Sequence, residues 1–177
     1  NSGRSHMLEH LVLSGTQKYP LKELFSEMLK RSFATLMNAF TANQWTSFPF
    51  STINKHDYFN ILDVYLDSCF HPQLSPVVFM SECFHTEFED NDPTKPLINS
   101  GVVYNEMRGS LNSSIQRVIK TLQENIFPDS PERFFSGGVP ECIAKSTIND
   151  IRDHHARYYH PSNAMFYHYG NNAFNYK

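Results

Sequence analysis

The sequence has few of the features that mark several large classes of protein. Its 177 residues contain three cysteines, widely spaced and never in a C-x-x-C pair, which argues against a disulfide framework and against a thiolate zinc site. A reducing compartment fits this cysteine usage best. The chain has no run of about 18 apolar residues and no charged-then-apolar leader, so we expect a soluble chain with no membrane partner. Phosphate-binding glycine loops and G-x-S-x-G nucleophile motifs are also missing.

The chain also lacks a large excess of positive or of negative charge. The net charge is -3, the isoelectric point is near 6.3, and no block of like charges occurs. A phosphate backbone is attracted by a basic surface, so nucleic acid is not an expected partner. The composition does include 40% hydrophobic residues, which is enough to bury a substantial core. We therefore expect one globular domain over residues 1–177.

The apolar pattern predicts helices interleaved with β-hairpins. Ser5 is available to cap the first helix, and Pro20 suits the first position of the second. Helices are predicted over 6–13, 21–29, 56–70, from 76 toward 90 before the chain extends, 101–127 with a soft break at Gly109, and 147–159. Strands are predicted over 33–41 and 45–53 as a hairpin, with a last strand over 163–169. This order favours an α+β domain with a mostly antiparallel sheet.

One short motif in the first helix carries chemistry. The segment from His6 to His10 reads H-x-x-E-H, with Glu9 as its acidic residue. Residues four apart lie on one helical face, so both imidazoles can reach one metal ion. A zinc ion suits such a site because three protein ligands leave a position for water, and Glu9 is placed to take a proton from that water.

The third ligand cannot be chosen by spacing. Glutamates are plentiful, and residue counting leaves all of the following open: Glu82, Glu87, Glu89, Glu106 and Glu124.

Five segments, taken in order, carry a resemblance to a known family. They are HMLEHLVLSGTQKYP (6–20), SFATLMNAFTANQWTSFPFST (32–52), GVVYNEMRG (101–109), SGGVP (136–140) and YYHPSNA (158–164). Together they resemble the first domain of the pitrilysin/insulinase family of zinc metallopeptidases, in the branch of presequence protease and falcilysin. The resemblance runs from Asn1 to about Gly170 and implies the fold of one pitrilysin-type domain that lacks its first strands.

The resemblance also assigns roles to residues. It implies that His6, His10 and Glu106 are zinc ligands and that Glu9 is the general base. It further implies that a peptide substrate binds as an added strand along a sheet edge beside the metal. An edge strand offers unpaired backbone groups, so such binding makes little demand on the peptide's sequence. The segment implied at this edge consists of Asn38, Ala39, Phe40 and Thr41.

Similar enzymes are several times longer and consist of four related domains in two halves. The resemblance implies that the second half supplies an Arg and a Tyr beside the zinc, so a C-terminal half, in cis or in trans, is an expected partner. The leading hypothesis is a zinc endopeptidase domain acting on short or unfolded peptides. The alternative is a zinc- or peptide-binding domain without turnover. The resemblance alone suggests a mitochondrion or plastid as the compartment.

Two other clusters in the sequence suggest metal sites only weakly. Glu82, His85 and Glu89 can share a helical face, but a di-iron site needs a second E-x-x-H motif, which is absent. We therefore expect a solvated helix face there. His154, His155 and His160 cluster in sequence, but a five-residue separation does not align two side chains on a helix, and the residues before Pro161 are better interpreted as a helix end.

Overall fold

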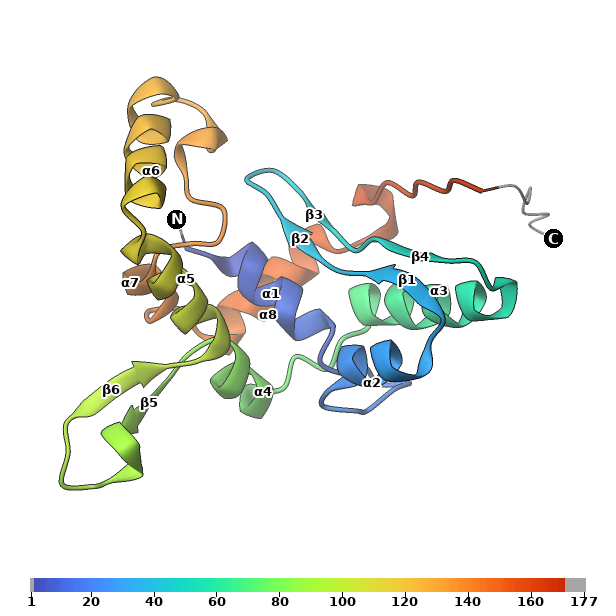
Figure 1. Ribbon diagram of the computed structural model, residues 1–177, viewed down its shortest axis with the longest axis horizontal. Coiled ribbons are helices and arrows are strands. Elements are labelled where there is room, and N and C mark those ends of the chain that lie inside the picture. Colours follow the sequence, from blue (N-terminus) through green and yellow to red (C-terminus); the bar gives the residue numbers. More distant parts are fainter. Residues whose placement is uncertain (1, 171–177) are drawn as a thin grey trace.

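The computed structural model describes residues 2–170, so positions 1 and 171–177 of the predicted domain lie outside the described residues. The described helices are α1 (Arg4–Val12), α2 (Leu24–Arg31), α3 (Lys55–Phe70), α4 (Pro76–Glu82), α5 (Val102–Asn112), α6 (Ser114–Ile126), α7 (Pro140–Ile143) and α8 (Ile148–Tyr158). The strands are β1 (Ala34–Met37), β2 (Phe40–Thr41), β3 (Thr46–Ser47), β4 (Phe50–Thr52), β5 (His85–Phe88) and β6 (Leu97–Ser100). Figure 1 shows their arrangement.

Within residues 2–170 the strands form three two-stranded antiparallel pairs, β1–β4, β2–β3 and β5–β6. The first two pairs are successive parts of the hairpin predicted over residues 33–53. The hairpin closes where the Ala42 N–H donates to the Trp45 carbonyl, 2.9 Å away. The α+β class with antiparallel strands is therefore confirmed, with the strands in separate pairs.

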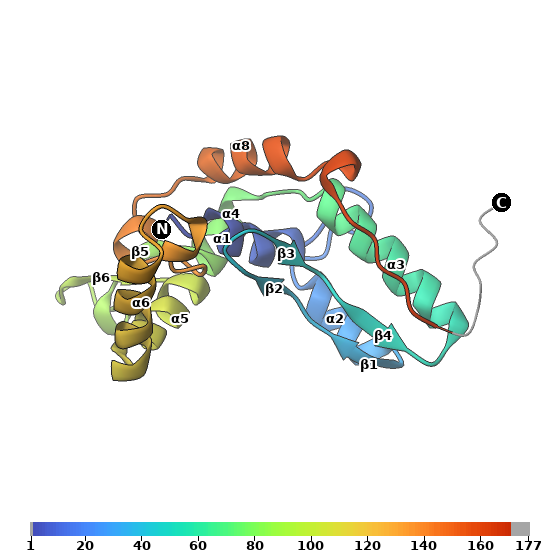
Figure 2. The same cartoon turned by 90° about the horizontal axis from the view of Figure 1, so that it is seen from above.

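Helix α1 lies at the centre of the molecule, with α8 against one side of it and the β2–β3 pair against another (Figures 1 and 2). Its apolar residues do not lie on one stripe, because the helix is covered on several sides. Four of them have at most 2% of their surface exposed: Met7, Leu8, Leu11 and Val12. They pack with residues of α4, α5, α7 and α8 in the main core. A smaller core joins the β1–β4 pair to α3 through Met37, Ile61 and Tyr65.

Helix α6 and the β5–β6 pair lie away from this centre (Figures 1 and 2). Helix α6 has no buried residue, although its apolar side chains repeat at helical spacing. Five of them are exposed: Ile115, Val118, Ile119, Leu122 and Ile126. None of the helices in the described part of the chain is both long enough and apolar enough to cross a membrane.

Several boundaries differ from the sequence predictions. Helix α1 begins earlier than expected, with Gly3 at its cap and Ser5 inside it, and α2 begins after Pro20, at Leu24. The break in the long helical segment falls at Ser113, because Gly109 keeps helical geometry with its neighbours. The extended segment predicted before residue 90 corresponds to β5, whereas β6 was not predicted. The predicted strand over 163–169 was wrong, because no neighbouring strand pairs with this segment among the described residues.

Candidate metal centre

The first turns of α1 present two histidines to the same place. His6 and His10 are one helical turn apart, and their ring centroids are separated by 5.0 Å. His6 is buried, and the side chain of His10 is 23% exposed. Because the neighbouring Met7, Leu8 and Leu11 are buried in the core, the helix has little freedom to rotate. The two imidazoles are therefore held on a packed scaffold.

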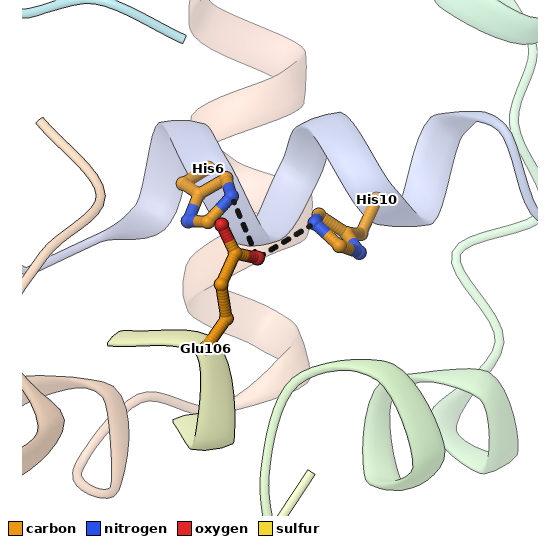
Figure 3. Close-up of side chains that lie close together, drawn as sticks. All are labelled: His6, His10 and Glu106. Atoms are coloured by element: carbon orange, nitrogen blue, oxygen red, sulfur yellow. Dashed lines mark ion pairs between the residues drawn. The ribbon is translucent and has the colours of Figure 1, made fainter. Parts of the chain in front are cut away.

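Glu106 reaches the same place from α5. Its Oε2 atom lies 3.6 Å from His6 Nε2 and 3.7 Å from His10 Nε2 (Figure 3). Val103 and Met107 on the same helix are buried in the core, which turns the Glu106 side chain toward α1. Among the residues that the structure describes, these three form the only close group of at least three metal-ligating side chains.

The other nitrogen of each imidazole has its own partner. His6 Nδ1 lies 3.3 Å from the Gly137 carbonyl oxygen, and His10 Nδ1 lies 3.4 Å from Glu82 Oε2. A carbonyl or carboxylate oxygen accepts, so in these contacts each Nδ1 carries the proton. In these tautomers each Nε2 has a free lone pair, which is the form of histidine that can bind a metal ion between the imidazoles and Glu106. This arrangement of outer partners is typical of histidines that bind a metal.

The glycines of the SGGVP motif allow the Gly137 contact. Gly138 has φ +85°, and a Cβ there would lie 2.4 Å from Gly3 Cα. A Cβ on Gly137 would lie 2.1 Å from Met107 Sδ. Two backbones therefore meet at the start of α1 at a distance that only glycine permits. The residue types of this motif do not indicate its role, because the positive φ of Gly138 cannot be read from the sequence.

Glu82 is an outer partner of the site, a role that the sequence did not indicate. Spacing left it open as a third metal ligand and also grouped it with His85 and Glu89, whereas its carboxylate lies beside His10 Nδ1. His85 instead contacts Glu87, with 3.1 Å between His85 Nε2 and Glu87 Oε2. The three residues are therefore not brought together. Glu82 is the last residue of α4, and this end of the helix could not be read from the sequence, which predicted helix beyond it.

The C-terminal histidines are separated by the structure and have other partners. Ser5 Oγ lies 3.2 Å from His154 Nε2, which joins α1 to α8, and burial lowers the pKa of His154. His155 Nε2 lies 2.8 Å from the Cys69 carbonyl oxygen. His160 Nδ1 accepts from the Ser162 N–H at the turn after α8. Each of these histidines therefore has a hydrogen-bonding partner within the fold, and none needs a metal to account for its position.

Glu9 lies on α1 between the two histidines and faces the β2–β3 pair. It is 9% exposed, and its Oε2 atom accepts a hydrogen bond from the Thr41 hydroxyl. Burying a carboxylate is costly unless a donor satisfies it, and Thr41 is such a donor. The proposed base therefore contacts the segment expected to bind the substrate.

That segment runs from the end of β1 into β2. The Asn38 N–H donates to the Pro49 carbonyl, 3.1 Å away, and the Ala39 N–H donates to Asn38 Oδ1 at 2.9 Å. The tip of the hairpin is anchored by Glu132, whose two carboxylate oxygens each lie 2.8 Å from a side-chain amide nitrogen. These donors, on Gln44 and Asn43, lower the pKa of Glu132.

The donor set fits a zinc ion. Two atoms bound to one zinc at about 2.0–2.2 Å lie no more than about 4.4 Å apart. The separations of Glu106 Oε2 from His6 Nε2 and His10 Nε2, 3.6 and 3.7 Å, meet this limit. Two imidazoles and one carboxylate also match the ligand set of catalytic zinc sites.

Comparison with known sequences gives a consistent family. The sequence model of the family described as Insulinase (Peptidase family M16) matches residues 1–117. The mitochondrial presequence protease of Mus musculus is 45% identical over 172 residues, which cover 97% of this chain and 17% of the mouse protein. The protein of the same name from Drosophila melanogaster is 46% identical over 171 residues, which cover 96% of this chain and 16% of the fly protein. The chain thus spans about one sixth of these relatives.

Solved structures show the same fold. A protease from Helicobacter pylori matches with a TM-score of 0.72 and 23% identity, over 91% of this chain and 34% of that one. Pitrilysin matches with a TM-score of 0.64 and 25% identity, over 89% of this chain and 15% of that one. The arrangement of helices around small antiparallel pairs is therefore a pitrilysin-like domain fold.

Proposed function

Because this chain belongs to the insulinase family, peptidase family M16, we propose that it is the zinc-carrying domain of a metalloendopeptidase. The proposed substrates are short or unfolded peptides. The proposed zinc ligands are His6, His10 and Glu106, and the proposed general base is Glu9. The relatives are named as proteases, which supports the peptidase assignment.

The observation that carries the proposal is the shared orientation of the two imidazoles. Both Nε2 atoms face Glu106 Oε2, at 3.6 and 3.7 Å, while both Nδ1 atoms are held by other groups. A histidine that only satisfied its polar atoms in a core would not need a second histidine and a half-exposed carboxylate at the same point. The tautomers and the donor set together support a metal centre.

Each residue has a distinct chemical task in this proposal. Zinc in such a site supplies Lewis acidity, which polarises a carbonyl oxygen and makes water more acidic. Glu9 takes a proton from the attacking water and passes it on to the leaving amine. Glu82 and the Gly137 carbonyl keep the imidazoles oriented.

The substrate is proposed to bind along the edge formed by Asn38, Ala39, Phe40 and Thr41. The nearby contact of Thr41 with Glu9 supports this placement, because a peptide bound there passes beside the proposed base. An added strand is bound through its backbone, so we expect broad specificity.

The domain is proposed to act with a C-terminal half, in cis or in trans. The curated relatives are about six times as long as the matched segment, which supports a larger assembly. Groups that stabilise a developing oxyanion contribute about 10²- to 10³-fold each, so a domain without them is expected to be slow. The names of the relatives support a mitochondrial location, which we extend to this protein as part of the proposal.

Cleavage of a quenched fluorescent peptide tests the proposal. The chain is loaded with zinc and assayed alone and after addition of a C-terminal half from a family member. We expect weak cleavage alone and a clear gain with the added half, and Glu9→Gln should abolish both. Activity that persists in Glu9→Gln would contradict the role of Glu9. Zinc and peptide binding without cleavage in either form would favour a binding domain without turnover.

A further inference from the structure

Within the part of the chain that the structure describes, the carboxylate of Glu9 accepts a hydrogen bond from one side chain, that of Thr41. Glu9 is 9% exposed, so water satisfies it poorly. Among the residues that the structure describes, the Thr41 hydroxyl is the only hydrogen-bond donor found for this carboxylate. A buried carboxylate without a donor is costly, and a hydrogen bond to a charged group is stronger than one between neutral groups. Thr41 therefore fixes the Oε2 atom, and no donor to Oε1 is present among residues 2–170.

Thr41 is itself held in place by the opposite strand. It pairs with Thr46 across the β2–β3 ladder, and the two hydroxyl oxygens are 3.3 Å apart. A threonine hydroxyl has one proton and two lone pairs, so it can donate to Glu9 while accepting from Thr46. The branched side chain also has few rotamers. The row from Glu9 through Thr41 to Thr46 therefore has a defined geometry.

The backbone of Thr41 faces away from β3, toward a side of β2 on which no strand of the described residues pairs. The N–H groups of Asn38 and Ala42 donate to Pro49 and Trp45 on the returning strand. Hydrogen-bonding direction alternates along an antiparallel strand, so the backbone groups of Thr41 point to the outer edge. A peptide added at this edge would pair with the backbone of Thr41, while the side chain of Thr41 holds Glu9.

We propose that Thr41 is a positioning residue that aligns Glu9 and couples its alignment to the bound peptide strand. This inference rests on the proposed function, in which Glu9 is the base and the β2 edge binds the substrate. A misplacement of about 1 Å at a reacting centre costs about 10²-fold in rate. Loss of the Thr41 hydroxyl should therefore reduce turnover much more than it reduces binding.

The first test needs no activity. Unfolding temperatures are measured for the metal-free chain carrying Thr41→Val, Glu9→Ala or both. We expect Thr41→Val to lower the unfolding temperature by roughly 3–10 °C when Glu9 is present, because the carboxylate loses its donor. In the Glu9→Ala background the same change should have little effect. Equal shifts in both backgrounds would overturn the proposal, whatever the protein's activity.

The second test separates positioning from binding. In the zinc-loaded chain assayed with its C-terminal half, Thr41→Val should lower kcat about 10- to 100-fold and change KM less than about twofold. Thr41→Ser, which keeps the hydroxyl, should restore most of the activity. Thr35→Val is the matched control, because Thr35 lies in the same hairpin and its hydroxyl contacts Ser51 instead, 2.7 Å away.

The outcomes of the second test are decisive in both directions. A large rise in KM with unchanged kcat would make Thr41 a binding residue only, and an equal loss in the Thr35→Val control would make the effect structural. Either result would overturn the proposal. Absence of Glu9-dependent cleavage in the unmodified protein would contradict the proposed function itself, and the unfolding temperatures would still decide whether Thr41 holds Glu9.

Discussion

Helices α1 and α6 contact the rest of the molecule in opposite ways. Six residues of α1 are buried, including His6 and Glu9, whereas no residue of α6 is buried. Helix α6 has the more regular apolar stripe, yet that stripe is exposed in this chain. Three of the four residues with candidate chemistry, His6, Glu9 and His10, thus lie on the helix that is packed on several sides. A stripe read from sequence shows which face can be buried, and the rest of the fold decides whether it is.

The largest difference between the two helices should be in stability. Leu8 is fully buried, so Leu8→Ala should lower the free energy of unfolding by about 2–5 kcal/mol. Leu122 on α6 is 51% exposed, and Leu122→Ala should cost less than about 1 kcal/mol. Urea unfolding of the two variants measures both values. Similar losses would show that α6 is packed more closely than its exposure indicates.

A second contrast concerns two glutamates outside the proposed ligand set. Glu82 contacts His10, whereas Glu124 on α6 pairs with Lys120, with 2.6 Å between the charged atoms. We expect Glu82→Ala to weaken zinc binding about 10- to 100-fold, because the imidazole loses its orienting partner. Glu124→Ala should leave zinc binding unchanged. Competition with a chromophoric chelator measures the affinities, and equal affinities for the two variants would remove Glu82 from the centre.

Replacing either of two glycines by alanine should change the free energy of unfolding by a smaller amount, with opposite signs at the two positions. Gly138 has φ +85° and lies against the Gly3 backbone, so Gly138→Ala should cost about 1–3 kcal/mol and disturb the Gly137 contact with His6. Gly109 lies within α5 with open space around it, so Gly109→Ala should stabilise by about 0.5–1 kcal/mol. Thermal unfolding checks both signs. Stabilisation by Gly138→Ala would contradict the close backbone approach.

The smallest effect should be a pH dependence of the stability contributed by Asp150, which lies at the start of α8. The Thr147 hydroxyl and backbone N–H, with the Arg4 guanidinium, hold the pKa of Asp150 below its ordinary value of 3.8. The folded pKa is the lower one, so this stabilisation is present above about pH 4 and is lost as pH falls below it. Asp150→Asn should therefore destabilise at pH 7, and the difference from the unmodified protein should shrink as the pH falls below about 4. A constant difference across that range would exclude the charge as its source.

Much of the fold could be predicted from local patterns. The helix at 56–70 and the hairpin at 33–53 follow from apolar spacing, and Thr147 with Asp150 forms a capping box at the start of α8. The strand predicted after Pro161 does not form, because a β-branched or aromatic run needs a neighbouring strand to pair with. Local sequence does not say whether such a strand is present. The break at Ser113 depends on how α5 and α6 pack, which no single residue encodes.

The site was only partly readable for the same reason. The H-x-x-E-H spacing placed His6 and His10 on one face, but spacing alone could not choose Glu106, and only the family resemblance did so. The contacts of Glu82 and Gly137 with the imidazoles join residues far apart in sequence. Thr41 was expected at a substrate edge, whereas its side-chain contact with Glu9 depends on how the hairpin docks on α1.

Metal analysis of single-residue variants tests the central claim most directly. The purified chain should bind about one zinc, and His6→Ala, His10→Ala and Glu106→Ala should each lower its occupancy sharply, because loss of one of three protein ligands disrupts the site. Glu9→Gln and the α6 control Glu124→Ala should retain the metal. Undiminished zinc in Glu106→Ala would contradict the ligand set, and with it the account of this centre.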